Sequence, residues 1–143
     1  ASVLTAIRGW LDKARLLGAG SIRVNVTRDA GPVNLDVVID TLRRAADYGQ
    51  SIGVKVLIEN HGGYTNSIPD MVGLVQRVDH EFCQITIDWG EFHTPGDRYE
   101  TMQLAMPYVH IVSAKGYSFD PVTHRHDAYD VARLVRNAEA GGF

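Results

Sequence analysis

Four short segments of the chain are almost continuously apolar and rich in valine and isoleucine. They are residues 21–25 (SIRVN), 54–59 (VKVLIE), 84–88 (QITID) and 109–115 (VHIVSAK). Continuous hydrophobicity, rather than alternation, is typical of strands that are covered on both faces, as in a parallel sheet. The pattern therefore predicts four buried parallel strands.

Between these segments, apolar positions recur at intervals of three and four residues, which is the periodicity of an amphipathic helix. The clearest case is residues 34–52, where Asn34 can cap the first turn and Gly53 follows the last one. Further helical patterns cover residues 2–17, 68–79, 98–106 and 128–140. Helices and strands thus alternate along the whole chain, beginning and ending with a helix.

Alternating helices and strands of this length form βα units, in which right-handed crossovers connect parallel strands. Two α/β architectures fit: part of a (β/α)8 barrel, or a small doubly wound parallel sheet. A complete barrel takes about 250 residues, and this chain has 143. We interpret residues 1–143 as a single α/β unit that looks truncated at both ends, because its first helix has no preceding strand.

Composition narrows the class of protein only slightly. The net charge is −3 and no basic run is present, so the sequence gives little support to nucleic-acid binding. No apolar stretch approaches the length that crosses a membrane. The single cysteine, Cys83, excludes an intrachain disulfide and is expected to be a buried free thiol. These features favour a cytoplasmic protein without membrane contact.

Polar side chains gather where each of the four predicted strands ends. They are Asn25 at the first strand, Glu59 and His61 at the second, Asp88, Trp89 and His93 at the third, and Ser113 and Lys115 at the fourth. Both candidate architectures bind ligands at the carboxyl ends of their parallel strands. The convergence of two acids, histidine and lysine on one rim therefore predicts a binding or catalytic site there.

The residue types suggest chemistry, although each has a structural alternative. Glu59 and Asp88 could supply carboxylate oxygens to a divalent cation, or they could cap helices and pair with arginine. Lys115 could stabilise an enolate or form a structural ion pair. Trp89 could line a pocket or pack in the core. The sequence contains neither a phosphate-binding glycine loop nor a GxSxG nucleophile motif.

Three segments, VKVLIENHGG, ITIDWGEFH and MPYVHIVSAKGYSFD, resemble strands four, five and six of the xylose-isomerase-like TIM barrels. SIRVN is similar to strand three of the same superfamily, which holds sugar (phosphate) isomerases and epimerases together with AP-endonuclease-type enzymes. The resemblance covers essentially the whole chain, and the chain covers about the middle half of the family barrel. It implies a partial (β/α)8 TIM barrel of about four βα units, strands three to six, in which residues 1–143 are a fragment of a longer barrel.

The resemblance also implies a divalent metal (Mn, Mg, Co or Zn) held by Glu59 and Asp88, which match the family's strand-four glutamate and strand-five aspartate. Ser113 stands where the family has a histidine ligand, and a hydroxyl is a poor substitute for imidazole. Glu59 and Lys115 are expected to be catalytic. Substrate contacts are expected from Asn25, His61, Trp89, His93 and Ser113.

The leading functional hypothesis from this resemblance is a metal-dependent isomerase or epimerase that acts on a small sugar or sugar phosphate through an enediolate. The enzyme assignment depends on the full barrel being present. The alternative is a non-catalytic ligand-binding or truncated barrel, which the serine at position 113 favours. An AP-endonuclease-like metallonuclease is third, because Glu91 stands where such enzymes carry a second histidine.

The first and last predicted strands would lie at open edges of a partial barrel. Unpaired edges that carry apolar residues recruit other strands, and the inner face of the sheet would also be uncovered. We therefore expect a homo-oligomer formed through the open strand edges.

Overall fold

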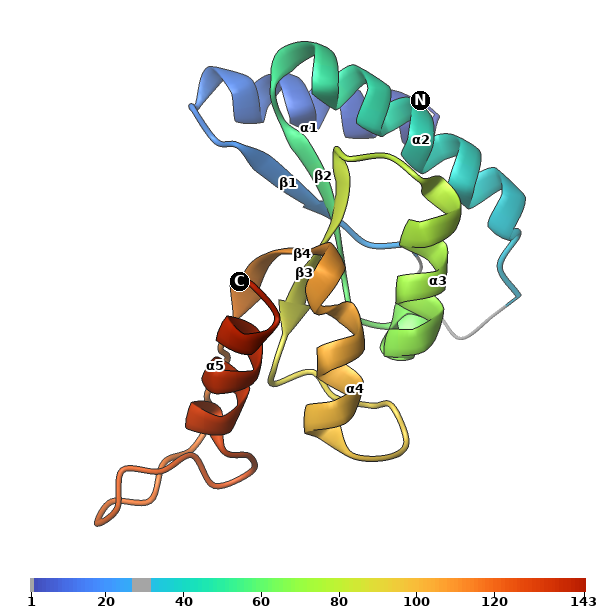
Figure 1. Ribbon diagram of the computed structural model, residues 1–143. Helices are drawn as coiled ribbons and strands as arrows, with labels where there is room; N and C mark the ends of the chain where they lie inside the picture. The colour runs from blue at the N-terminus through green and yellow to red at the C-terminus, as the bar shows by residue number, and fades with distance from the viewer. Residues whose placement is uncertain (1, 27–31) are drawn as a thin grey trace.

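A computed structural model describes residues 2–26 and 32–143 of the chain. Its strands are β1 (Ser21–Val24), β2 (Lys55–Glu59), β3 (Cys83–Asp88) and β4 (Val109–Ser113). They form one parallel sheet in the order β1-β2-β3-β4 (Figure 1). The prediction of four parallel strands in sequential order is confirmed.

In the described residues, five α-helices alternate with these strands. They are α1 (Val3–Leu16), α2 (Leu35–Ile52), α3 (Ile68–Val78), α4 (Arg98–Ala105) and α5 (Val131–Ala140), with short 3-10 helices η1 (Gly63–Asn66) and η2 (Met106–Tyr108). The last helix begins at Val131 rather than at residue 128, because the Asp130 side chain caps it by accepting a hydrogen bond from the Arg133 N–H. The fourth strand ends at Ser113, two residues before the end predicted for it.

The helices form a single layer that follows the sheet. Each helix contacts the next one in chain order, and Figure 1 shows them arranged around one side of the strands. Right-handed crossovers that all run in one direction place every helix on the same face. A doubly wound sheet needs a reversal in strand order, which this sheet lacks. The doubly wound alternative is therefore wrong, and the described residues form an unclosed part of a TIM barrel.

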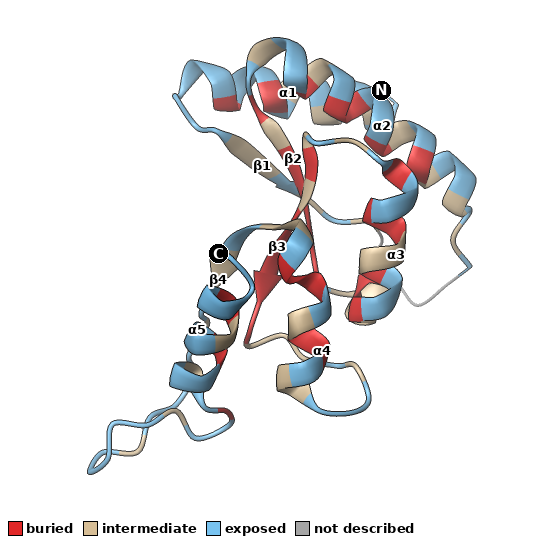
Figure 2. Ribbon diagram, viewed as in Figure 1, coloured by how far each residue is buried: buried red, intermediate tan, exposed pale blue. Residues whose placement is uncertain are grey.

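The hydrophobic core lies between the sheet and the helices. Alternate strand residues point towards the helices and are completely buried, namely Val56 and Ile58 of β2 and Ile85 and Ile87 of β3. Figure 2 shows buried segments in β2 and β3. Cys83 is 1% exposed and forms no disulfide, as expected for a buried free thiol. No helix in the described part of the chain has the length and hydropathy needed to cross a membrane.

The opposite face of the sheet corresponds to the inside of a barrel, and no helix of residues 2–26 and 32–143 forms a layer on it. Leu57 and Thr86 point to this face, and Ile111 on β4 is 42% exposed there. The total exposed surface is 8042 Å², compared with about 7,300 Å² for a compact folded protein of this mass. On the inner face the exposure is at β4, because Leu57 and Thr86 are only 2% and 7% exposed.

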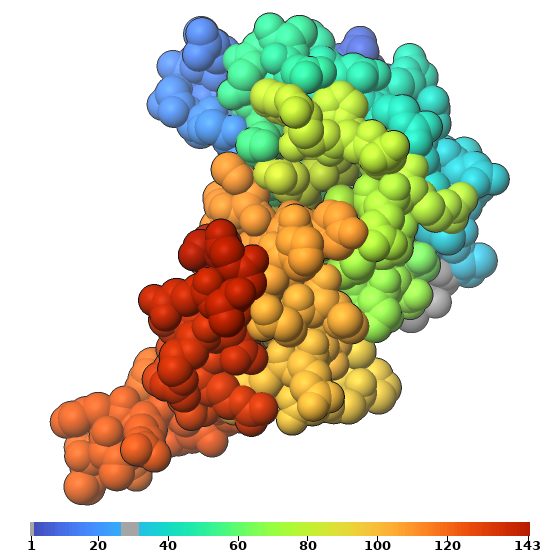
Figure 3. Space-filling model, viewed as in Figure 1, coloured from blue at the N-terminus to red at the C-terminus, as the bar shows by residue number. Residues whose placement is uncertain are grey.

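Between β4 and α5 the chain forms an arm, residues 116–128, which Figure 3 shows projecting from the rest of the molecule. An antiparallel bridge between Phe119 and His126 holds the arm together, with their ring centroids 5.3 Å apart. The arm begins directly after Lys115, so its start lies at the carboxyl end of β4.

Candidate active site

The two carboxylates predicted from the strand ends lie on the same face of the sheet. In the strand register, Glu59 pairs with Thr86, and Asp88 pairs with Ser113. Paired residues of a parallel ladder point to the same side, and residues two apart on one strand do so as well. Glu59, Asp88 and Ser113 therefore all face the inside of the partial barrel at the carboxyl ends of adjacent strands. Their placement on one rim agrees with the sequence-based expectation.

Glu59 is held by an arginine that the sequence analysis did not assign to the site. Arg23 on β1 donates from Nη1 to Glu59 Oε2 in a direct ion pair. The Glu59 side chain is only 7% exposed, whereas that of Arg23 is 49% exposed. His61 lies on the same carboxylate, with Nδ1 3.9 Å from Oε2. A carboxylate this deeply buried requires a cationic partner, and Arg23 supplies it.

Lys115 joins the ends of β3 and β4 through two ion pairs. Its Nζ lies 2.9 Å from Asp88 Oδ2 and 2.8 Å from Glu91 Oε1. The hydrogen bond from Lys115 lowers the pKa of Glu91 to about 2, and the same bond raises the pKa of Lys115. We refer to this group as the Lys115 cluster, which comprises Asp88, Glu91, Ser113, Lys115 and Tyr117.

Besides Lys115, three side chains contact the Asp88 and Glu91 carboxylates of this cluster. Tyr117 donates its hydroxyl proton to Glu91 Oε1 at 3.0 Å, and His93 Nε2 lies 3.2 Å from Glu91 Oε2. Ser113 donates from Oγ to Asp88 Oδ2 at 3.2 Å. The expected site residues His93 and Ser113 are therefore brought together with Lys115, and Glu91 and Tyr117 are members that the sequence analysis missed.

Asn60 fixes the position of this rim, although it was not among the predicted site residues. Its side chain is completely buried. Its Oδ1 accepts from the Asp88 N–H at 2.7 Å, and its Nδ2 donates to the Asp88 carbonyl at 2.8 Å and to the Glu91 carbonyl. Asn60 thereby clamps the end of β3 to the end of β2, with Glu59 directly before it. A buried amide that ends an otherwise apolar strand was the signal available in the sequence.

Two predicted substrate contacts lie away from the rim. Trp89 is 4% exposed and packs in the core on the helix side of the sheet, which agrees with the packing alternative and removes it from the pocket wall. Its side chain points there because it follows Asp88 by one residue, and successive strand residues face opposite sides. Asn25 is exposed and borders a different cavity.

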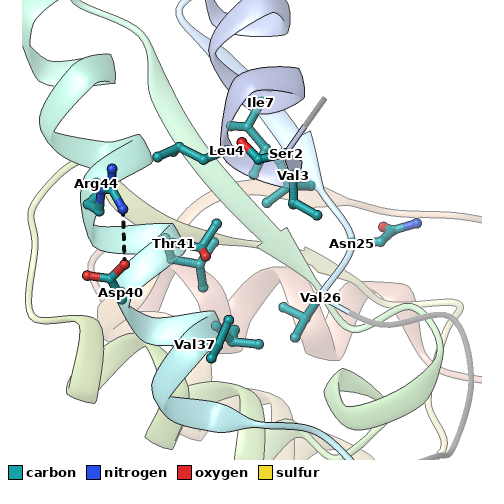
Figure 4. A pocket seen from close by; sticks show the side chains of 13 residues that line it. Ser2, Val3, Leu4, Ile7, Asn25, Val26, Val37, Asp40, Thr41 and Arg44 are labelled. Atoms are coloured by element: carbon teal, nitrogen blue, oxygen red, sulfur yellow. Dashed lines mark hydrogen bonds and ion pairs between the residues drawn. The ribbon is translucent and has the colours of Figure 1, made fainter.

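That cavity has a volume of about 520 Å³ and lies between α1, α2 and the end of β1 (Figure 4). Its wall is mainly aliphatic, formed by side chains such as Val3, Leu4, Ile7, Val26 and Val37. It lies along an edge strand, and an Asp40–Arg44 pair at 3.5 Å borders it. Because it contains none of the converging carboxylates, we assign the candidate chemistry to the strand-end rim.

The donor groups at the rim do not fit a divalent metal as they are arranged. Asp88 Oδ1 accepts from the Gly90 N–H at 2.8 Å, and Oδ2 accepts from two members of the Lys115 cluster. The Glu59 carboxylate is paired with Arg23. Within residues 2–26 and 32–143, no group of three or more His, Cys, Asp or Glu side chains could hold a metal ion. This geometry gives no support to the expected metal site at Glu59 and Asp88. It also gives no support to the AP-endonuclease-like metallonuclease, which would need metal ions at the same rim.

Together, the parallel strands in sequential order and the single helix layer define part of a TIM barrel, with a candidate site at the carboxyl ends of the strands. The chain belongs to the xylose isomerase-like TIM barrel family, because the sequence model of that family matches residues 1–134. The resemblance seen in the strand-end motifs is thus confirmed at the level of the family. No curated protein matched the sequence.

Three solved structures illustrate the similarity. A xylose isomerase-like TIM barrel protein from Mycobacterium smegmatis in complex with magnesium is 21% identical with a TM-score of 0.78, covering 98% of this chain and 57% of its own. D-allulose 3-epimerase from Methylomonas sp. is 16% identical with a TM-score of 0.76, and the match covers 98% of this chain and 52% of the epimerase. The IOLI protein with a bound zinc atom is 18% identical with a TM-score of 0.76, and the match covers 98% of this chain and 56% of that protein. The chain thus spans just over half of each structure, and at these identities the likeness establishes the fold.

Proposed function

We propose that this chain forms the central part of a barrel that binds a small sugar or sugar phosphate at the strand-end rim and moves a proton between adjacent carbons. The observation that carries the proposal is the alternation of charge along that rim, from Arg23 and Glu59 to Asp88 and Lys115. Carboxylates accept hydrogen bonds from sugar hydroxyls, while Arg and Lys donate to hydroxyl or phosphate oxygens. The D-allulose 3-epimerase among the similar structures is consistent with this ligand class.

In this proposal Glu59 is the general base. Its carboxylate removes the proton from the carbon next to the substrate carbonyl, and the electron pair moves to the carbonyl oxygen to give an enediolate. Return of the proton to the neighbouring carbon, together with movement of the hydroxyl proton from one substrate oxygen to the other, completes an aldose–ketose isomerisation, and Glu59 ends in its original state. Epimerisation at one carbon additionally requires a proton donor on the opposite face of the substrate. Arg23 and His61 hold the Glu59 carboxylate in place for this role.

Magnesium and zinc in similar structures make a divalent metal the family-based expectation. The donor set at this rim does not fit one, so the steps above use only side chains of this chain.

The experiment is solvent exchange in D2O with the protein encoded by the whole reading frame, using a panel of ketoses that includes D-allulose and sugar phosphates. Proton NMR should show deuterium entering at the carbon next to the carbonyl. Glu59→Gln should slow this exchange by about 10²–10⁴-fold, the usual contribution of a general base. Glu139→Gln, which alters an exposed acid on α5, is the matched control and should leave the rate unchanged.

A second candidate function is ligand binding without turnover. It is favoured by the ion pairs in which both Glu59 and Asp88 are already engaged. Sugar binding by calorimetry without any deuterium incorporation would support this candidate and would contradict proton transfer.

A further inference from the structure

The Lys115 ammonium lies between two carboxylates at the rim, in a place where a bound metal cation would also be attracted. It contacts both Asp88 Oδ2 and Glu91 Oε1 within 3.0 Å. The Asp88 side chain is 2% exposed and that of Glu91 is 19% exposed, whereas that of Lys115 is 33% exposed. The ammonium therefore pairs with two partly enclosed carboxylates while it stays accessible to a solute.

The chain around Lys115 is shaped to hold it there. A Cβ atom on Gly90 would lie 3.0 Å from Lys115 Cβ and 3.1 Å from the Lys115 carbonyl oxygen, so only glycine permits this close approach without a shift. On the other side, the Tyr129 hydroxyl donates to the Lys115 carbonyl. The backbone of Lys115 is thus fixed from two directions, and its ammonium has a defined position.

Two of the three donors of the Lys115 ammonium are committed to carboxylates. A lysine side chain has three N–H donors, and two of them are directed to Asp88 and Glu91. The third faces the Tyr117 side chain, whose hydroxyl also contributes to raising the pKa of Lys115 and whose ring centroid lies 5.8 Å from Nζ. This N–H makes no ion pair, so an oxygen atom of a bound substrate can replace the neutral Tyr117 hydroxyl as its acceptor.

A metal ion at the same place would have to displace this arrangement. The oxygens of Asp88 already accept from Gly90, Ser113 and Lys115. Ser113 also offers a neutral hydroxyl at the position where the xylose-isomerase-like barrels are expected to have a histidine ligand. Like charges repel strongly when they are close and partly buried, so a divalent cation and the Lys115 ammonium exclude each other.

We propose that the Lys115 ammonium takes the place of the divalent metal at this rim and stabilises negative charge on the substrate oxygen. This inference rests on the proposed function. When Glu59 removes the carbon-bound proton, the electron pair moves to the carbonyl oxygen, and the third Lys115 N–H donates a hydrogen bond to that oxygen. No proton leaves Lys115. The charge on the oxygen is lost when Glu59 returns the proton to the neighbouring carbon and the proton of the adjacent hydroxyl moves to the charged oxygen.

The first test measures metal binding directly and needs neither a variant nor a substrate. Mn²⁺ is titrated into the metal-free chain while electron paramagnetic resonance records the free ion. We expect the free-ion signal to follow that of a protein-free titration, with no stoichiometric uptake. Uptake of one Mn²⁺ per chain would overturn the inference and would leave the proposed sugar chemistry standing.

The second test uses Lys115→Met, which keeps the length of the side chain and removes its charge. In the D2O exchange assay with chelator present, we expect wild-type exchange to persist and Lys115→Met to lose about 10²–10³-fold, as when an oxyanion donor is removed. Lys13→Met, an exposed change on α1, is the control. Loss of wild-type exchange in chelator, or unchanged exchange in a folded Lys115→Met protein, would refute the role of Lys115. Absence of exchange with every ketose would instead contradict the proposed function.

Discussion

Replacing Asn60 with alanine should destabilise the protein more than any single change at an exposed polar residue. Three hydrogen bonds join the buried Asn60 amide to the backbone of Asp88 and Glu91. A buried hydrogen bond contributes about 1 kcal/mol net, so the loss of three amounts to about 3 kcal/mol. This is a large fraction of the roughly 5–15 kcal/mol that stabilises a typical domain.

The assay is urea unfolding followed by tryptophan fluorescence, for which the buried Trp89 is a natural probe. Asn60→Asp is an informative companion, since it keeps the shape and the acceptor for the Asp88 N–H but replaces both donors with a buried negative charge. We expect it to destabilise the fold at least as much as Asn60→Ala. Asn25→Ala removes an exposed amide that makes no side-chain hydrogen bond with the described residues, and it should change stability by less than about 0.5 kcal/mol.

A loss below about 1 kcal/mol for Asn60→Ala would refute this reasoning. It would mean that water or a backbone adjustment satisfies the freed groups, and that the end of β3 does not depend on the Asn60 clamp.

Three other predictions concern titration, reactivity and assembly. In Lys115→Met the pKa of Glu91 should rise from about 2 towards its ordinary value of 4.5, as followed by carbon-detected NMR. Because the native pKa of Glu91 is depressed, Glu91 stabilises the wild-type fold above pH 4.5, and this contribution is lost as the pH falls towards 2. Lys115→Met should flatten this pH dependence of stability, and an unchanged pKa of Glu91 would contradict the ion pair. Burial raises the pKa of Cys83 to about 12, so a thiol reagent should fail to label it at neutral pH until urea is added, and rapid labelling of the folded chain would show that it is accessible. The open edges at β1 and β4 should give a dimer or larger assembly in light scattering, whereas a stable monomer would show that the edges need no partner.

Periodicity was sufficient to predict the helices and strands because local signals agree with the global fold. In α2, the Asn34 side chain accepts from the Val37 N–H, and Gly53 adopts the left-handed conformation at φ 74° that ends the helix. The choice between barrel and doubly wound sheet could not be made from periodicity alone, because it depends on strand order, which the residues of any one βα unit do not encode.

The rim itself could be predicted because the carboxyl ends of parallel strands meet at one edge. The partners of its carboxylates could not, since Arg23 reaches Glu59 across 36 residues of sequence and Lys115 reaches Glu91 across 24. These contacts depend on side-chain rotamers and strand register rather than on spacing. Trp89 was different: strand alternation after Asp88 was enough to point it into the core.

Sugar binding at the strand-end rim is tested most directly by an NMR titration of the isotope-labelled protein with a ketohexose. We expect amide shifts to concentrate in residues 59–61, 88–93 and 113–117, where the charged side chains converge. Lys115→Met should weaken these shifts, and Lys13→Met should preserve them. Shifts that instead concentrate around the cavity between α1 and α2, at residues 2–7 and 37–44, would contradict the assignment of the site to the rim.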